Sequence, residues 1–345
     1  MLRSLLRACL LLTVTAARSG DAQLPHGTVE HRRFRAPSLG VQKNMLVYLP
    51  PSYVATAGAA RRYPVALYLH GRWGDETDWV TLGRLPQVMD SLVASGMPEM
   101  IVVMPDGDDG WWMTWALPQR RDACRREPHR DEAPDEYCVP TPRYDEYVVH
   151  DVVSYVDSAY RTIAQRDARA IGGLSMGGYG AISLAMRYPE MFVAAASHSG
   201  VLVPGLMPDS SSIPTVGRIT WRAGRSRSEL REATHARWAG MYPMFGFDSS
   251  TWRRRDPLTL LAALRAAGRP VPALYADVGR RDELVQQNRT FVEQSRRLDV
   301  AIEYAEWDGD HSWATYQRNL GHGLRFLSRH LTRAPAVAGI TPIVN

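Results

Sequence analysis

One short segment, residues 169–180, restricts the possible folds of this chain more than any other. Residues 169–172 are predicted to form a short strand, which leads into Gly173-Leu174-Ser175-Met176-Gly177. A serine with glycines two positions before and after it is typical of a sharp strand-to-helix turn that exposes the hydroxyl. We expect a side chain at position 173 or 177 to collide across this turn. The alternative is a glycine-rich turn that contains a serine by chance.

Strand-like and helix-like segments alternate from about residue 43 to residue 332. The pattern predicts strands at residues 44–49, 64–69, 100–104, 169–172, 192–196, 271–278 and 301–305. It predicts helices at residues 144–160, 177–188, 257–267, 283–298 and 312–331. Asp256 is the expected N-cap of the third of these helices, because Pro257 follows it. This alternation favours an α/β fold with a mostly parallel central sheet and helices on both faces.

Two segments interrupt the alternation, residues 106–143 and residues 201–255. Both mix aromatic side chains with many polar ones. We interpret them as insertions over the carboxyl edge of the sheet, where open α/β folds place their ligand sites. The chain from residue 23 to residue 335 is otherwise predicted to be a single domain, and residues 336–345 are expected to form a loose tail.

The first 22 residues are typical of an export signal peptide. Arg3 and Arg7 precede or flank an apolar stretch, residues 8–17, that is too short for a membrane span, and we place the cleavage after Ala22. Removal of this segment takes away three arginines and one aspartate, so the net charge falls from +5 to +3. That modest charge does not indicate a nucleic-acid partner. We therefore expect a secreted or periplasmic protein without a membrane span once the signal is removed.

The cysteines fit the same compartment. Cys124 and Cys138 are the two cysteines that remain after the predicted cleavage, and they lie 14 residues apart. Such a pair in an exported protein predicts a disulfide, which would stabilise the fold by about 3 kcal/mol. Two free thiols are the alternative. No metal-ligand spacing accompanies the cysteines, so no metal site is expected.

A serine hydroxyl is a poor nucleophile unless a neighbouring base accepts its proton. His311 is the candidate base, because it follows the predicted strand at 301–305 in a loop that can reach the turn at Ser175. Asp282 follows the preceding strand and is the candidate acid that orients the imidazole. The alternative for Asp282 is a helix N-cap. Asp277 and Asp310 are the rival acids, the first inside a strand and the second beside the histidine.

The order Ser, Asp, His along the chain is the one expected of α/β-hydrolases. Acyl transfer also requires hydrogen-bond donors for the oxyanion that develops on the substrate. The backbone N–H of Met176 is one candidate, and that of Arg72 in Leu69-His70-Gly71-Arg72 is the other. Three other histidines are weaker candidates for the base, because packing or turn structure explains them better: His70, His198 and His322.

These motifs together resemble the esterase D family of α/β-hydrolases. That family includes S-formylglutathione hydrolases, bacterial feruloyl and acetyl-xylan esterases, and the antigen 85 mycolyltransferases. The resemblance extends over about residues 43–330. The matching stretches are Tyr68-Leu69-His70-Gly71, Val103-Met104-Pro105-Asp106-Gly107, Gly173-Leu174-Ser175-Met176-Gly177-Gly178-Tyr179-Gly180, Gly279-Arg280-Arg281-Asp282 and Gly309-Asp310-His311-Ser312-Trp313.

The resemblance implies an esterase site in which Ser175, Asp282 and His311 are the catalytic residues. It also places Arg72 and Met176 at the oxyanion-hole positions. No cofactor or metal is required for such a reaction. The segment around Tyr144 is similar to one that often carries an acidic residue in the family, and we assign Glu146 a structural role in support of the serine turn.

The substrate is left open by the residues themselves. Trp111 and Trp112, with Trp115 nearby, are candidates for binding an aromatic or sugar part of an ester, and packing of the insertion is the alternative. We expect a serine carboxylic ester hydrolase that acts through an acyl-enzyme on a small-molecule or carbohydrate-linked ester. An acyltransferase with the same acyl-enzyme, or a binding protein that retains the fold, is the alternative function.

Overall fold

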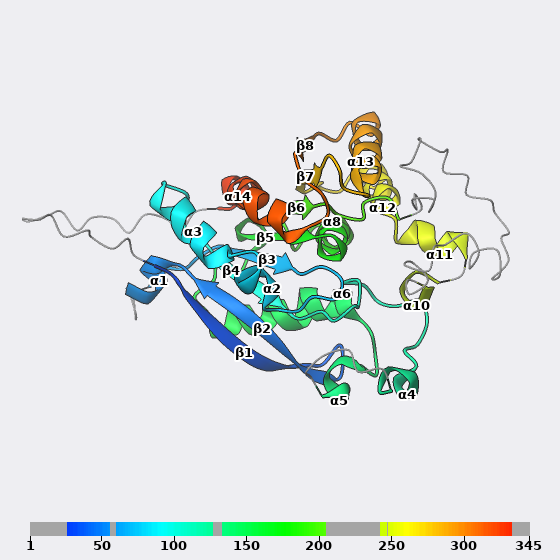
Figure 1. Cartoon of the computed structure of the whole chain (residues 1–345), viewed down its shortest axis with the longest axis horizontal. Helices are drawn as coiled ribbons and strands as arrows, with labels where there is room; N and C mark the ends of the chain where they lie inside the picture. Colours follow the sequence, from blue (N-terminus) through cyan, green and yellow to red (C-terminus); the bar gives the residue numbers. More distant parts are fainter. Residues whose placement is uncertain (1–25, 56–59, 127–132, 205–241, 247, 333–345) are drawn as a thin grey trace, which may run out of the picture.

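The computed structural model describes residues 26–55, 60–126, 133–204, 242–246 and 248–332 (Figure 1). An eight-stranded sheet with the order β1-β2-β4-β3-β5-β6-β7-β8 forms its centre. β2 runs antiparallel to its two neighbours, β1 and β4. The other six strands, β3 to β8, all run parallel to one another. The strands are β1 (Thr28–Ala36), β2 (Val41–Leu49), β3 (Val65–Leu69), β4 (Ile101–Pro105), β5 (Arg169–Leu174), β6 (Ala194–His198), β7 (Ala273–Gly279) and β8 (Ile302–Trp307).

Helices cover both faces of this sheet, because alternate strand residues point to opposite sides. In β3, Val65, Leu67 and Leu69 pack in the core that α7, α8, α12 and α13 cover, while Ala66 and Tyr68 pack under α2, α3 and α14. The helices are α1 (Pro51–Ala55), α2 (Asp78–Thr81), α3 (Leu85–Ala94), α4 (Arg121–Cys124), α5 (Pro134–Tyr137), α6 (Tyr144–Glu146), the π-helical turn η1 (Tyr147–Val152), α7 (Val153–Ala159), the 3-10 turn η2 (Arg166–Ala168), α8 (Met176–Arg187), α10 (Tyr242–Phe245), α11 (Ser249–Arg254), α12 (Pro257–Ala266), α13 (Val285–Arg297) and α14 (Trp313–His330).

The α/β architecture expected from the sequence is present. Each predicted strand and helix occurs, with its ends displaced by at most three residues. Asp256 caps α12, since its carboxylate accepts a hydrogen bond from the Thr259 amide at 2.9 Å. The predicted helix 144–160 is divided into α6, η1 and α7 by the π-helical turn.

Two of the differences from the predicted strands have a clear physical reason. β1 (Thr28–Ala36) is not predicted, because six of its nine residues are exposed and several are arginines, so it lacks an apolar face. It lies at the edge of the sheet, where pairing with β2 alone suffices. β6 extends to His198, beyond the predicted end at residue 196, because Ser197 and His198 are buried although they are polar.

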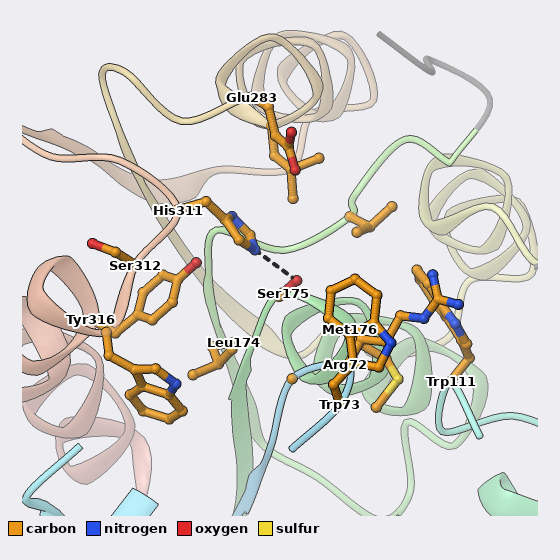
Figure 2. Close-up of a pocket in the computed structure, with 14 residues that line it drawn as sticks. Arg72, Trp73, Trp111, Leu174, Ser175, Met176, Glu283, His311, Ser312 and Tyr316 are labelled. Carbon is orange, nitrogen blue, oxygen red and sulfur yellow. Dashed lines mark hydrogen bonds between the residues drawn. The ribbon is translucent and has the colours of Figure 1, made fainter. Parts of the chain in front are cut away.

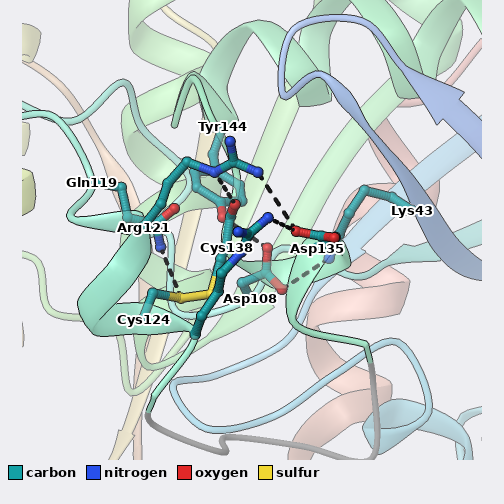
Figure 3. Close-up of a disulfide and its surroundings, with 9 residues drawn as sticks. Lys43, Asp108, Gln119, Arg121, Cys124, Asp135, Cys138 and Tyr144 are labelled. Carbon is teal, nitrogen blue, oxygen red and sulfur yellow. Dashed lines mark hydrogen bonds and ion pairs between the residues drawn. A yellow bond between two sulfur atoms is a disulfide. The ribbon is translucent and has the colours of Figure 1, made fainter.

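The first insertion contains the predicted disulfide. Cys124 ends α4, Cys138 follows α5, and the bond joins them with a Cα–Cα distance of 5.8 Å (Figure 3). Arg121 Nε donates to the Cys138 carbonyl at 3.3 Å, which adds a second link between the two short helices. The disulfide prediction is therefore confirmed.

Other sequence-based expectations cannot be compared with the structure. The predicted signal peptide and the predicted tail at residues 336–345 lie outside the described residues, as do residues 205–241 of the second insertion. Across the segments that the structure describes, no helix has both the length and the apolar character that a bilayer crossing requires.

Candidate active site

The serine turn joins β5 to α8 in a strained conformation. Ser175 has φ 52° and ψ −114°, a backbone conformation that non-glycine residues rarely adopt. Its amide donates to the His198 carbonyl at 2.9 Å, which ties the turn to the end of β6. The side chain therefore leaves the carboxyl edge of the sheet at a fixed place, at the start of α8.

Two glycines permit the close approach that this turn requires. A Cβ atom at Gly173 would lie 2.5 Å from the Gly177 carbonyl oxygen, and one at Gly177 would lie 2.5 Å from the His70 oxygen. Both distances are shorter than real Cβ contacts. The collision predicted for side chains at these two positions is thus confirmed.

Three distant side chains form a continuous hydrogen-bonded chain at this edge of the sheet. His311 Nε2 lies 3.0 Å from Ser175 Oγ (Figure 2). His311 Nδ1 lies 2.9 Å from Asp282 Oδ2. A carboxylate only accepts, so Nδ1 carries the imidazole hydrogen and Nε2 is free to accept the hydrogen of the serine hydroxyl. The Asp282 side chain is fully buried, whereas that of His311 is 23% exposed.

Backbone contacts hold the Asp282 and His311 loops together. The Arg280 and Arg281 amides, after β7, donate to the carbonyls of Trp307 and Gly309 at 2.8 and 2.9 Å. The second oxygen of Asp282 accepts from the Leu284 amide at 2.8 Å. The carboxylate thus orders the turn before α13 and binds the imidazole at the same time. The N-cap of α13 is Leu284, so Asp282 is not the helix N-cap that was the alternative.

The rival acids have other partners. Asp277 accepts hydrogen bonds from His198, Tyr275 and Trp307 inside the sheet. Asp310 is exposed, and the hydrogen bond from the Ser312 hydroxyl lowers the pKa of its carboxyl. Neither therefore orients His311 through a hydrogen bond that the structure contains.

The other histidines are in packing positions. His198 is buried beside Asp277, and the His322 ring packs on Trp307 with a centroid separation of 4.6 Å. His70 is buried and accepts from the Gly107 amide at 2.9 Å through Nε2, so its Nδ1–H donates to the Gly71 carbonyl at 2.8 Å. These two bonds fix the backbone of the loop after β3, which carries Arg72.

A buried ionic cluster lies beneath that loop. Lys43 is 2% exposed and its ammonium group contacts the carboxylates of Asp106 and Asp108, the latter at 2.8 Å. Tyr144 donates to the other oxygen of Asp108 at 2.7 Å. A lysine next to the apolar segment 45–49 and the Pro105-Asp106-Gly107 motif are the sequence signals that could have revealed this cluster.

Glu76 lies near the same loop. Burial and then the charge of Asp106 raise the pKa of Glu76 to about 7. Its carboxylate also lies 3.7 Å from His31 Nε2. Glu76 is therefore a carboxyl group that changes charge close to neutral pH.

A cavity of about 260 Å³ opens at Ser175. Figure 2 shows His311 and Arg72 on opposite sides of the serine, with Met176 below it. Met176 begins α8, so its backbone N–H is among those at a helix start that have no intrahelical acceptor. The lining residues are Gly71, Arg72, Trp73, Trp111, Leu174, Ser175, Met176, Val201, Glu283, Leu284, His311, Ser312, Trp313 and Tyr316.

The tryptophans differ from the expectation in part. Trp111 lines the cavity, but Trp112 and Trp115 do not. Trp112 is 1% exposed, fills the space beside Gly107 and Gly180, and donates to the His70 carbonyl at 3.3 Å. The packing alternative therefore holds for Trp112, and the structure does not support a substrate contact there.

Trp73 was not expected to line the site. It is 63% exposed, the most exposed large apolar side chain in the described part of the chain. The Arg72 guanidinium lies 4.9 Å from the centre of its ring. The Asp109 carboxylate accepts from its amide at 2.6 Å. Its position after His70-Gly71 is the sequence signal that could have identified it.

The structure does not give Glu146 the expected role in support of the serine turn. Glu146 is partly exposed and contacts Arg143. Asp145 is buried and accepts hydrogen bonds from Thr114 at 2.6 Å and Tyr188 at 3.2 Å. The assignment of Glu146 was therefore wrong, because the start of α6 turns Asp145 toward the protein interior and leaves Glu146 partly exposed.

Metal ligands are not gathered elsewhere in the described residues. No cluster of three or more histidine, cysteine, aspartate or glutamate side chains with metal-binding geometry occurs among them.

Comparison with known proteins identifies the family to which this chain belongs. The Esterase family model, described as "Putative esterase", matches residues 36–327. The acetyl esterase of Caldicellulosiruptor saccharolyticus is 24% identical over 261 residues, which are 76% of this chain and 82% of that protein. Esterase Rv1288 of Mycobacterium tuberculosis is 31% identical over 168 residues, but the match covers 49% of this chain and only 31% of that protein.

A solved ferulic acid esterase has the same fold. It superposes with a TM-score of 0.62 and 23% identity over 89% of this chain and 99% of its own. The matched region holds β3, β5, β7 and β8, whose ends carry the loop of Arg72, the serine turn and the loops of Asp282 and His311. The chain therefore belongs to the Esterase family and is a carboxylic ester hydrolase of the α/β-hydrolase fold.

Proposed function

We propose that the enzyme is a serine esterase that acts through an acyl-enzyme on Ser175. The observation that carries this proposal is the unbroken hydrogen-bonded chain from Ser175 through His311 to the buried Asp282. The chain opens into a cavity, and the serine occupies a strained turn. A carboxylate, an imidazole and a hydroxyl in this order are the groups that nucleophilic acyl transfer needs.

The geometry accounts for each proton transfer. Ser175 Oγ attacks the ester carbonyl carbon while His311 Nε2 accepts the hydroxyl proton. Asp282 stabilises the imidazolium that forms. The carbon–oxygen bond to the alcohol then breaks, its electron pair goes to the alcohol oxygen, and Nε2 returns the proton to that oxygen. Water repeats the sequence on the acyl-enzyme and releases the acid.

The oxyanion is stabilised by two backbone N–H groups, those of Met176 and Arg72. Met176 supplies a helix-start N–H, and the start of α8 adds the favourable end of the helix dipole. Arg72 lies on the loop that His70 holds through Gly71 and Gly107. Such a donor contributes about 3 kcal/mol to transition-state stabilisation.

The acyl group lies on the side of Ser175 away from His311, against Trp73 and Trp111. His311 protonates the alcohol, so the alcohol leaves on the histidine side and the acyl group takes the opposite wall. That wall is aromatic and the cavity is small, which suits a short or planar acyl group. Related proteins are named acetyl esterase and ferulic acid esterase, and acetyl and feruloyl groups are of these two kinds.

Acyl-enzyme trapping tests the mechanism. Brief mixing with p-nitrophenyl acetate and acid quenching should give a peptide acetylated at Ser175, detected by mass spectrometry, together with a burst of nitrophenol. Ser175→Ala should give neither. Turnover of the ester by the wild-type enzyme without any acetyl group on Ser175 would overturn the mechanism, and no turnover at all would favour the binding-protein alternative.

A substrate panel tests the acyl wall. Trp73→Ala should lower kcat/KM for methyl ferulate more than for methyl acetate, and Leu82→Ala, which removes another exposed apolar side chain, serves as the control. An unchanged ratio would exclude Trp73 as an acyl contact.

Product analysis with and without an added alcohol distinguishes the hydrolase from the acyltransferase.

Export of the enzyme is part of the same proposal. The disulfide between Cys124 and Cys138 supports it, because disulfides persist in oxidising compartments. Edman sequencing of the exported protein should begin at Gln23. A cytoplasmic protein that retains Met1 would contradict the signal-peptide assignment.

A further inference from the structure

One buried hydroxyl at the cavity has no role in the mechanism above. Tyr316, in the first turn of α14, is 4% exposed and lines the cavity. Its hydroxyl makes no hydrogen bond of normal length and angle to the residues that the structure describes, although the Ser199 side chain is close enough to lower its pKa. A buried hydroxyl without a partner costs about 1–3 kcal/mol, so its presence beside Ser175 suggests a partner that binds there. Figure 2 shows the hydroxyl pointing toward His311 and Ser175.

The ring of Tyr316 is held in a defined position. It packs edge-on against His311 at a centroid separation of 5.6 Å and against Trp313 at 5.8 Å. These contacts direct the hydroxyl to the histidine side of the serine. The position differs from that of the oxyanion donors, Arg72 and Met176, which lie on the other side of the cavity in Figure 2.

The hydroxyl remains protonated under all physiological conditions. Burial, followed by the charge of Asp282, raises the pKa of Tyr316, although the nearby Ser199 side chain acts in the opposite direction. A neutral phenol can donate one hydrogen bond to a developing negative charge and keep its own proton.

We propose that the Tyr316 hydroxyl donates a hydrogen bond to the oxygen of the departing alcohol, as a catalytic residue additional to Ser175, His311 and Asp282. The inference rests on the acyl-enzyme mechanism. When the carbon–oxygen bond breaks, its electron pair moves to the alcohol oxygen. His311 Nε2 transfers its proton there, and Tyr316 stabilises the charge that develops before this transfer is complete.

The contribution depends on the alcohol. A sugar or alkyl alkoxide is strongly basic and gathers much charge on its oxygen as it leaves, so a second donor stabilises it substantially. A p-nitrophenolate spreads the charge into its ring and needs little help. A purely structural tyrosine would affect the two kinds of ester equally.

Tyr316→Phe tests the proposal because it removes one oxygen and keeps the ring contacts. We expect kcat/KM for ethyl acetate to fall about 10- to 100-fold, the range for a hydrogen bond to a charged group. For p-nitrophenyl acetate we expect less than about a twofold change, since little charge remains on its oxygen. The two substrates share the acetyl group, and kcat/KM reports steps only through acylation, so deacylation does not enter the comparison.

Tyr147→Phe is the matched control. The Tyr147 hydroxyl is also buried and without a hydrogen-bond partner among the described residues, but Tyr147 lies in η1 and does not line the cavity. We expect this variant to match the wild-type enzyme with both esters and in thermal unfolding. Equal changes for both esters in Tyr316→Phe, or no change, would overturn the proposal.

Failure of the underlying mechanism is recognised separately. If Ser175→Ala retains wild-type activity, the acyl-enzyme mechanism fails, whatever Tyr316→Phe does. If Ser175→Ala is inactive but Tyr316→Phe does not discriminate between the esters, only the role of Tyr316 is excluded.

Discussion

Two histidine–carboxylate pairs occupy this sheet, and they have nearly the same local geometry. His311 joins Asp282 at 2.9 Å and the Ser175 hydroxyl at 3.0 Å. His198 joins Asp277 at 3.0 Å and the Tyr68 hydroxyl at 2.8 Å. The first pair lies in the loops after the strands, where His311 borders the cavity, whereas the second pair lies within β6 and β7.

Their surroundings differ in every respect that matters for chemistry. The His311 side chain is 23% exposed, and that of His198 is 1% exposed. Burial and the charge of Asp277 raise the pKa of Tyr68 well above its ordinary value, so this phenol stays protonated. A carboxylate, an imidazole and a hydroxyl in line are therefore insufficient for catalysis. Solvent access and a strained serine turn distinguish the first pair, which we propose as the catalytic one.

The two hydroxyls should give the largest contrast. We expect Ser175→Ala to lower kcat for p-nitrophenyl acetate by about 10⁴-fold or more while the protein stays folded, because the nucleophile is lost. Tyr68→Phe should leave kcat within a few fold and reduce stability by about 1 kcal/mol, since it removes one buried hydrogen bond. Initial rates and thermal unfolding of both variants measure the contrast. A Ser175→Ala enzyme with near wild-type rates would break the comparison.

The two carboxylates should give the next contrast. Asp282→Asn should lower kcat by about 10³- to 10⁴-fold at unchanged folding, because the amide cannot hold the imidazole in the required tautomer. Asp277→Asn should mainly destabilise the protein, by about 2 kcal/mol, since a buried donor then faces other donors. Steady-state kinetics and urea unfolding separate the two effects.

Asp310→Asn is the control for the carboxylate comparison. It removes a charge beside His311 without touching the hydrogen bond from Asp282. We expect a milder loss of activity than in Asp282→Asn. The reverse order would reassign the acid to Asp310.

The smallest of the expected effects is a pH dependence of stability that arises from Glu76 and not from either histidine pair. The pKa of Glu76 is about 7 in the folded protein against an ordinary value of 4.5, so the folded state binds its proton more tightly. Protonated Glu76 therefore adds about 3 kcal/mol to the free energy of unfolding. This stabilisation is fully present below pH 4.5 and is lost as the pH rises through 7.

Glu76→Gln should therefore flatten the pH dependence of the unfolding free energy between pH 5 and pH 8. Urea unfolding at both pH values measures it. A wild-type protein that is as stable at pH 8 as at pH 5 would show that Glu76 does not titrate in this range.

Much of the fold and site follows from local patterns in the chain. Alternating apolar segments predict the parallel strands, since buried strands leave continuous apolar runs. The glycines around Ser175 reflect a close backbone approach, in which an added Cβ atom would lie only 2.5 Å from a carbonyl oxygen. Asp282 and His311 could be predicted because each follows a parallel strand, and such strands end at the same edge.

Contacts between distant segments account for the differences. β1 forms although its pattern is charged, because β2 offers a free edge. Whether Trp73 or Trp112 lines the cavity depends on how the loop after β3 packs over His70. Residue type alone does not distinguish the two tryptophans, since a side chain's exposure depends on neighbours far away along the chain.

The residue patterns of this chain alone determine a parallel α/β sheet with a serine at a strand-to-helix turn, because backbone geometry and periodic burial are local properties. The folded arrangement of distant segments determines that His198 and Asp277 form a buried pair, that Asp145 rather than Glu146 points inward, and that the Tyr316 hydroxyl points to Ser175. Each of these depends on distances between residues that the chain order does not contain.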